Sequence, residues 1–133
     1  MSILYVDTSA LLKRVFVEAE SNVVGALLLS RHVAGDLLTA SSIAWLEVWR
    51  SLRRAGTADV DALASAALSG VAEFPLSDDV VTRAREVGND ELRSLDAIHL
   101  ASALAVGADT LLTYMRLADS AAATGLEILQ PSG

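Results

Sequence analysis

Short apolar runs alternate with longer segments of helical periodicity along the whole chain, and this alternation predicts a succession of strands and helices. The first apolar run is partly β-branched and ends at Asp7, after which Thr8 and Ser9 are typical of a helix start. The pattern predicts strands at residues 3–6, 37–40, 74–76, 110–114 and 126–129. It predicts helices at residues 8–12, 18–32, 42–55, 57–72, 80–87, 94–106 and 117–123.

Strands that are apolar on both faces and separated by helices favour a parallel sheet that is covered on both sides. The length of 133 residues suits one domain, and 53% hydrophobic with 20% charged residues exclude a disordered chain. We therefore expect a single α/β domain over residues 1–133, with a central parallel sheet and helices on both faces. Ligands of such sheets bind beyond the carboxyl ends of the strands, so Asp7 is the first candidate site residue.

The chain is acidic, but its charge is unevenly distributed. The net charge is −7; residues 1–54 hold six bases and five acids, whereas residues 55–133 hold four bases and twelve acids. An acidic protein binds polyanions poorly as a whole, so any contact with nucleic acid has to be local and to involve the first half. A basic protein partner suits the same charge distribution.

Cysteine is absent, which excludes disulfides, thiolate metal sites and cysteine nucleophiles, so carboxylates have to carry any metal chemistry. The longest apolar runs are far shorter than the roughly 20 residues of a membrane-spanning helix. The N-terminus also lacks the charged segment that opens a secretory signal. We expect a soluble, unprocessed protein with no membrane partner, and the absence of cysteine is compatible with a cytoplasmic location.

Asp7 and Asp96 are two candidate site carboxylates, and each has a plain structural alternative. Asp7, followed by Thr8 and Ser9, also suits a helix cap. Asp96 suits the first turn of a helix, where the helix dipole favours a carboxylate. Residues 97–106 are apolar nearly all round, so we expect this helix to be buried and its N-terminus to point into a crevice.

Glu47 is the third candidate carboxylate. Counted at 100° per residue, it lies about 200° around its helix from Trp45 and faces away from the main apolar stripe. Its structural alternative is a solvated side chain paired with Arg50, although Ile43 and Leu46 on the same side argue mildly against this. The apolar stripe has the spacing of core packing or of an oligomer surface, and it consists of Trp45, Val48, Trp49 and Leu52.

Three segments taken together resemble the signature of the PIN-domain family. They are residues 7–11 (DTSAL) after a strand, Glu47 within a helix, and residues 92–101 (LRSLDAIHLA), of which the last is the most specific. The match is best to the VapC-type toxins of toxin–antitoxin pairs and covers essentially the whole chain, including residues 111–114 (LLTY). The resemblance implies a parallel sheet with helices on both sides, metal-dependent RNA cleavage, a small VapB-like antitoxin as partner, and a homodimer.

By this resemblance, Asp7, Glu47 and Asp96 are the catalytic and metal-binding acids, and Thr8 or Ser9 supports the first of them. Three carboxylates within a few Å repel one another, by about 4 kcal/mol per pair at 4 Å, unless they are protonated or share a cation. A hard ion, Mg²⁺ or Mn²⁺, resolves this repulsion and activates water for RNA hydrolysis without a covalent enzyme intermediate. The candidates for holding the RNA backbone are Lys13, Arg14, Arg50, Arg53 and Arg54, some of which also suit a solvated helix face.

The chain departs from the family pattern at one acidic position. The family usually places a further Asp directly after the Thr–Tyr pair, whereas Met115 follows Thr113 and Tyr114 here. Asp119 is the nearest carboxylate, and it lies one helical turn or more further on, so a substituting role for it is the less favoured possibility. The missing acid leaves an alternative function open, namely a catalytically weak or inert PIN-fold module that binds antitoxin or RNA.

Other α/β classes fit the sequence less well. A receiver-like phosphoacceptor domain needs a lysine late in the chain, and Lys13 is the only lysine. A haloacid-dehalogenase-type phosphatase needs an Asp where Ser9 stands, and the glycine motifs of P-loop and Rossmann proteins are absent. His32 and His99 are too far apart to form a local metal motif, and we expect a packing or hydrogen-bonding role for His99, one turn after Asp96.

Overall fold

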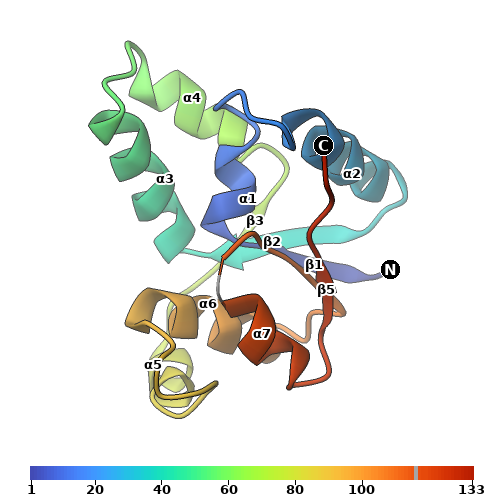
Figure 1. Cartoon of the computed structure of the whole chain (residues 1–133), viewed down its shortest axis with the longest axis vertical. Coiled ribbons are helices and arrows are strands. Elements are labelled where there is room, and N and C mark those ends of the chain that lie inside the picture. Colours follow the sequence, from blue (N-terminus) through green and yellow to red (C-terminus); the bar gives the residue numbers. More distant parts are fainter. Residues whose placement is uncertain (116) are drawn as a thin grey trace.

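The computed structural model describes residues 1–115 and 117–133. In this part of the chain, one sheet of five parallel strands runs through the centre of the molecule, in the order β3-β2-β1-β4-β5 (Figure 1). The central strand pairs with both neighbours, with Tyr5 opposite Thr39 on one side and opposite Leu111 on the other. The strands are β1 (Ile3–Val6), β2 (Leu37–Ser41), β3 (Ala72–Phe74), β4 (Thr110–Leu112) and β5 (Glu127–Leu129).

Helices connect the strands and cover both faces of the sheet. In the described residues they are α1 (Thr8–Leu12), α2 (Ser21–Val33), α3 (Ile43–Arg54), α4 (Val60–Ala67), α5 (Asp78–Ala84), α6 (Ser94–Ala105) and α7 (Leu117–Ala122). Figure 1 shows α1 to α4 on one side of the sheet and α5 to α7 on the other. None of these helices has the length and apolar character needed to cross a membrane. The predicted α/β fold, with a parallel sheet between two helical layers, is confirmed.

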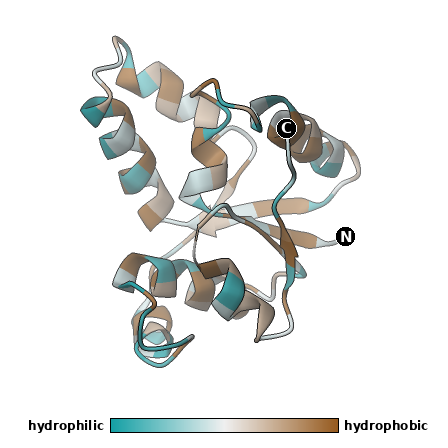
Figure 2. Cartoon of the chain, viewed as in Figure 1, coloured by the Kyte–Doolittle hydropathy of each residue, from teal (hydrophilic) through white to brown (hydrophobic). Residues whose placement is uncertain are grey.

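Alternate residues of β1 pack into two hydrophobic cores, one on each face of the sheet. Leu4 and Val6 belong to the core formed with α1 to α4, whereas Tyr5 belongs to the core formed with α6, α7 and β4. Figure 2 shows the hydrophobic residues concentrated where the helices face the sheet. Burial on both faces explains why this strand is a continuous apolar run, and each fully buried large aliphatic side chain contributes about 1.5–3 kcal/mol.

Two boundaries differ clearly from those predicted, and local chemistry accounts for both. The helix expected at residues 57–72 is shorter, because Asp59 caps α4 with its side chain and the chain turns at Gly70, where φ is +75°. The strand expected at residues 74–76 lies two residues earlier as β3, because Pro75 has no N–H to continue the ladder.

The other differences concern the ends of elements. The helix expected from residue 18 begins at Ser21, whose hydroxyl accepts the backbone N–H of Glu18 and so closes a turn before α2. Ser77 caps α5, which therefore begins two residues earlier than predicted and ends at Ala84. The strand expected at residues 110–114 ends at Leu112. Each remaining end agrees with the prediction or differs from it by one residue, within the usual uncertainty of helix and strand boundaries.

The carboxyl ends of the central strands bring together segments that are far apart in sequence. β1 leads directly into Asp7, β2 ends at Ser41, and β4 is followed by Thr113. The Thr113 hydroxyl donates a hydrogen bond to Asp7, 106 positions away. This edge of the sheet is the position predicted for a ligand site.

Candidate active site

Asp7 is a fully buried carboxylate that both caps a helix and lies at the edge of the sheet. Its Oδ1 accepts the Ala10 backbone N–H at 3.2 Å and the Ser9 hydroxyl at 2.5 Å, and its Oδ2 accepts the Thr113 hydroxyl. Burial raises the pKa of Asp7, although the nearby His99 and these hydrogen bonds oppose the increase. The helix-cap interpretation of Asp7 is confirmed, and it is compatible with a role in a site.

Glu47 is half-buried on α3 and has two partners at the same carboxylate oxygen. Thr8 Oγ1 donates to Oε1 at 2.7 Å, and His99 Nε2 lies 2.6 Å from that oxygen. Burial raises the pKa of Glu47, but the hydrogen bond and charge of His99, together with the Thr8 hydroxyl, lower it to below its usual value. The interpretation of Glu47 as a solvated partner of Arg50 is wrong, because α1 and α6 supply its partners and no Glu47–Arg50 ion pair occurs in the described chain.

His99 lies completely buried in α6 and has partners at both ring nitrogens. Its Nδ1 lies 2.7 Å from Tyr5 Oη, and the Ser41 backbone N–H donates to the same phenol oxygen at 2.9 Å. The rings of Tyr5 and His99 meet edge to face, with centroids 5.8 Å apart. Burial raises the pKa of Tyr5 well above its usual value. The hydrogen-bonding role predicted for His99 is confirmed.

Asp96 lies in the first turn of α6, one turn before His99, and only 6% of its surface is exposed. Residues three apart share one face of a helix, so Asp96 and His99 face the same side of α6. The prediction that this helix is buried is confirmed, because most of its residues from Asp96 to Ala103 are buried. A carboxylate at this position is stabilised by the positive end of the helix dipole.

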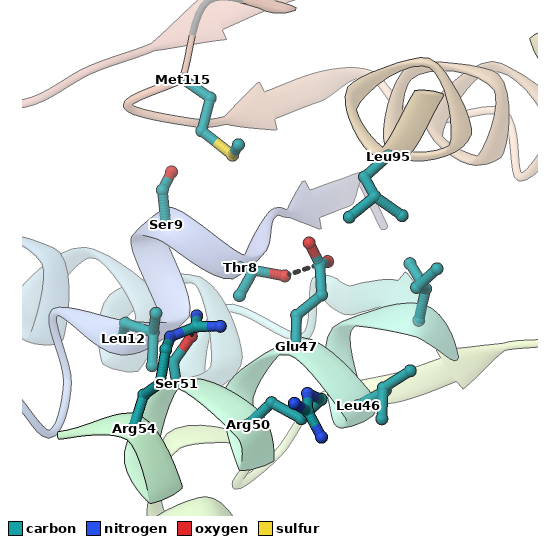
Figure 3. Close-up of a pocket in the computed structure, with 11 residues that line it drawn as sticks. Thr8, Ser9, Leu12, Leu46, Glu47, Arg50, Ser51, Arg54, Leu95 and Met115 are labelled. Carbon is teal, nitrogen blue, oxygen red and sulfur yellow. Dashed lines mark hydrogen bonds between the residues drawn. The ribbon is translucent and has the colours of Figure 1, made fainter. Parts of the chain in front are cut away.

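A pocket of about 390 Å³ lies beside this network. Figure 3 shows Glu47 projecting into it from α3, between Thr8 of α1 and Leu95 of α6. Met115 and Ser9 lie near each other on the side of the pocket away from Leu95. Its wall combines polar groups with a larger apolar part. The residues that line it are Thr8, Ser9, Leu12, Ile43, Leu46, Glu47, Arg50, Ser51, Arg54, Leu95 and Met115. Asp7 and Asp96 are not among these lining residues, so Glu47 is the only one of the three candidate acids that lines it.

Two of the five basic residues considered as RNA contacts line the pocket. Arg50 and Arg54 lie on the same side of α3 as Glu47, one and two turns further along the helix (Figure 3). Arg53 is exposed on another side of α3 and does not line the pocket. The three arginines are alike in sequence, but of the three only Arg50 and Arg54 line the pocket.

Lys13 and Arg14 are engaged elsewhere with protein acceptors. The Lys13 ammonium lies 2.7 Å from Glu18 Oε2 and 2.9 Å from Glu20 Oε2, and it is 4.6 Å from the centre of the Tyr114 ring. The Arg14 guanidinium donates to backbone carbonyls at the end of α4, at 2.8 and 2.9 Å. Both side chains therefore fix the loop around α1, and neither lines the pocket.

Met115 lines the pocket directly after Thr113 and Tyr114, at the position where the resemblance predicts an acid. Two hydrogen bonds hold this turn, from the Tyr114 N–H to Ser9 Oγ and from the Met115 N–H to Thr113 Oγ1, both at 3.0 Å. Asp119 is exposed on α7 and is not among the residues that line the pocket.

The three candidate acids suit a hard divalent cation by their chemistry, since Mg²⁺ and Mn²⁺ prefer carboxylate oxygens. Their arrangement in this structure is less favourable. Within the described residues, no three His, Asp or Glu side chains are grouped closely enough to hold a metal ion. The oxygens of Asp7 accept hydrogen bonds from protein donors, whereas both partners of Glu47 lie at Oε1. Holding an ion therefore requires the carboxylates to draw together.

Tyr5, Ser41 and Thr113 belong to the site but are not predicted from the sequence. Tyr5 stands inside a short apolar strand and has the pattern of a core residue. Ser41 and Thr113 are small hydroxyl residues at strand ends, where such residues are common in turns. One signal was available for Ser41 and Thr113. Both lie at the carboxyl ends of predicted strands, which is the edge of a parallel sheet where ligands bind.

Residues 4–114 match the model of the PIN domain. The chain is 34% identical over 135 residues to Ribonuclease VapC46 of Mycobacterium tuberculosis, which covers 99% of this chain and 100% of that protein. Its fold is similar to that of VapC20 of Mycobacterium tuberculosis, a sarcin–ricin loop cleaving toxin, with a TM-score of 0.73, 24% identity, and coverage of 96% of this chain and 99% of that one. It is also similar to a chain of a toxin–antitoxin complex from Klebsiella pneumoniae, with a TM-score of 0.57, 22% identity, and coverage of 86% and 87%. The chain therefore belongs to the PIN-domain family and, within it, to the VapC type.

Proposed function

We propose that this chain is an endoribonuclease toxin of a toxin–antitoxin system, which hydrolyses RNA phosphodiesters with the help of Mg²⁺ or Mn²⁺. The observation that carries the proposal is Glu47, a glutamate with a lowered pKa that projects into a pocket at the ligand-binding edge of a PIN fold. Relatives that match this chain over nearly its full length carry the name ribonuclease.

Asp7, Glu47 and Asp96 are the residues that would hold the ion. When bound, a divalent cation supplies an activated water and neutralises the charge that develops on the phosphodiester. The residues of the chain orient the carboxylates: Ser9 and Thr113 direct the two oxygens of Asp7, and Thr8 directs Glu47. Hydroxyl donors of this kind fix the geometry of acidic ligands and are part of the function of such sites.

Arg50 and Arg54 are the proposed contacts to the RNA backbone, because both line the same pocket wall as Glu47. Guanidinium groups bind phosphates with two parallel hydrogen bonds, which suits a phosphodiester presented to Glu47. The apolar part of the wall, including Leu95 and Met115, offers a surface for a base that is not paired, the form in which sequence-specific RNA recognition usually occurs.

An antitoxin of the VapB type is the proposed protein partner. One structure of similar fold is part of a toxin–antitoxin complex. The net charge of −7 favours a basic segment in that partner. We also propose a homodimer and a cytoplasmic location, as the family resemblance implies.

A second candidate function follows from Met115. The thioether lines the pocket where the family usually has a carboxylate, so the cation would lose a ligand and cleavage would weaken. The alternative is a PIN-fold module that binds antitoxin or RNA but cleaves slowly or not at all. Measured turnover distinguishes the two functions.

Cleavage of a panel of structured RNAs by the purified chain tests the proposal, with Mg²⁺, Mn²⁺ or EDTA present. Asp96→Asn, prepared in the same way, is the matched variant, and its folding is checked by circular dichroism. We expect cleavage that requires the metal and is lost in Asp96→Asn. Binding of RNA or antitoxin by a folded protein that cleaves none of the RNAs with either metal would favour the inert module.

A further inference from the structure

A buried chain of hydrogen bonds connects Glu47 to the interior of the protein. It runs from the Ser41 N–H to Tyr5 Oη, from Tyr5 Oη to His99 Nδ1, and from His99 Nε2 to Glu47 Oε1, with donor–acceptor distances of 2.9, 2.7 and 2.6 Å. Tyr5 and His99 are fully buried. Polar groups are costly in a core unless they are hydrogen-bonded, and a complete network makes the local structure unique. This network ends at the acid that projects into the pocket.

The proton between His99 and Glu47 lies on the histidine. The Glu47 carboxylate can only accept, so His99 Nε2 carries a proton and donates it to Oε1, whether the ring is neutral or protonated. On the other side of the ring, Tyr5 Oη accepts the Ser41 N–H and forms a second hydrogen bond with His99 Nδ1, in which Nδ1 is the acceptor when the ring is neutral. Thr8 donates to the same oxygen. Two donors at one oxygen fix the direction of the whole carboxylate.

The network also ties Glu47 to the other two candidate acids. Tyr5 lies two residues before Asp7, Thr8 directly follows Asp7, and His99 lies one turn after Asp96. A shift of the imidazole ring therefore changes the place of Glu47 relative to both acids. A glutamate without such partners occupies several rotamers, and fixing it during folding removes that entropic cost from the later binding of ion and substrate.

We propose that His99, oriented by Tyr5, is a positioning residue that holds the Glu47 carboxylate in the geometry required for RNA cleavage. The inference rests on the proposed nuclease function and adds two residues to its machinery. His99 does not itself line the pocket, so it acts on the reaction through Glu47.

Four variants test this role. His99→Gln keeps an N–H donor close to the place of Nε2 and an acceptor towards Tyr5, whereas His99→Leu keeps the approximate volume and removes both groups. Tyr5→Phe removes only the hydroxyl that orients the ring. Leu100→Val is the control, because Leu100 is a fully buried neighbour on α6 that packs in the core with Tyr5 and takes no part in the hydrogen bonds.

Three quantities are measured for each variant: the kcat of RNA cleavage, the KM for RNA, and the affinity for Mn²⁺, determined by titration without RNA. We expect His99→Leu and Tyr5→Phe to lower kcat and to weaken Mn²⁺ binding by roughly 10- to 100-fold, as is typical for residues that orient ligands, while KM for RNA changes little. His99→Gln should restore most of both, and Leu100→Val should resemble the wild type. Thermal unfolding of every variant shows which ones fold, and Tyr5→Phe carries the test alone if His99→Leu does not fold.

The possible results separate this inference from the proposed function. Losses in His99→Leu and Tyr5→Phe no larger than in Leu100→Val would overturn the positioning role, as would a His99→Gln variant that folds but is as impaired as His99→Leu. If the wild type binds Mn²⁺ but cleaves no RNA, the nuclease function fails. Weaker Mn²⁺ binding in His99→Leu and Tyr5→Phe than in Leu100→Val would then still support the positioning of Glu47. A wild type that neither cleaves nor binds Mn²⁺ overturns both.

Discussion

Replacing Asp7 by alanine and by asparagine separates the acceptor role of this carboxylate from its charge. Asp7 caps α1 by accepting the Ala10 N–H, and its second oxygen accepts the buried Thr113 hydroxyl. Alanine removes both acceptors: the lost cap costs about 1 kcal/mol, and a buried hydroxyl without its partner costs about 1–3 kcal/mol. Asparagine keeps an oxygen for the cap and a polar group beside Thr113, and it removes a negative charge that burial disfavours.

We therefore expect the free energy of unfolding of Asp7→Ala to be about 2–4 kcal/mol below that of Asp7→Asn. Asp7→Asn should be at least as stable as the metal-free wild type. Equilibrium unfolding in urea, followed by circular dichroism, measures these differences, and in a chain of 133 residues they correspond to roughly 5–15 °C in melting temperature. Asp90→Ala, at an exposed acid, is the control and should stay within about 0.5 kcal/mol of the wild type.

Two results would refute this reasoning. Equal stabilities of the alanine and asparagine variants would show that the buried acceptors of Asp7 do not support the fold. RNA cleavage by Asp7→Asn at the wild-type rate would remove Asp7 from the site, because both variants are expected to lose cleavage.

Two further predictions concern the pocket, and a third concerns Asp36, which accepts a hydrogen bond from the backbone of Ser2. Met115→Asp should lower the Mg²⁺ concentration needed for half-maximal cleavage by roughly tenfold, because it adds a carboxylate to the pocket wall; an unchanged metal dependence would show that position 115 lies too far from the ion. The double variant Arg50→Ala/Arg54→Ala should raise KM for RNA and reduce the slope of log affinity against log salt by roughly 1.4, whereas Arg53→Ala should change neither. An effect of Arg53→Ala as large as that of the double variant would reject the pocket as the RNA contact. The Ser2 backbone N–H and the Arg31 guanidinium lower the pKa of Asp36. The contribution of the Asp36 carboxylate to stability is therefore present at neutral pH and is lost as pH falls through its folded-state pKa. Asp36→Asn should thus be less stable than the wild type at pH 7, and urea unfolding at several pH values should show this difference shrinking below about pH 4; a constant difference would contradict the assignment.

The fold could be predicted largely from the sequence because the sheet is buried on both faces. Burial on both faces makes the central strands continuous apolar runs, and these runs are visible without a structure. Positions that depend on a single cap or proline were harder to predict. The ends of α4 and β3 were misplaced because Asp59 and Pro75 each decide a boundary that periodicity alone does not mark.

The site was predicted less completely, because its contacts join residues far apart in sequence. A helical wheel places Glu47 away from the apolar stripe of its own helix, but it contains no information on what covers that face. The partners of Glu47 come from α1 and α6, and the contact between Tyr5 and His99 spans 94 positions. Charge alone also could not distinguish Arg50, which lines the pocket, from Lys13, which pairs with two glutamates.

The central claim is that Asp7, Glu47 and Asp96 together hold the ion that supports RNA cleavage. Diffraction from crystals soaked in Mn²⁺, collected where manganese scatters anomalously, tests it most directly. The expected result is an anomalous peak beside Glu47 at the edge of the sheet, with oxygens of all three acids drawn in to about 2.0–2.2 Å, the distance typical of a hard divalent ion. A Mn²⁺ ion bound elsewhere, or a protein that cleaves RNA while this position stays empty at saturating Mn²⁺, would contradict it.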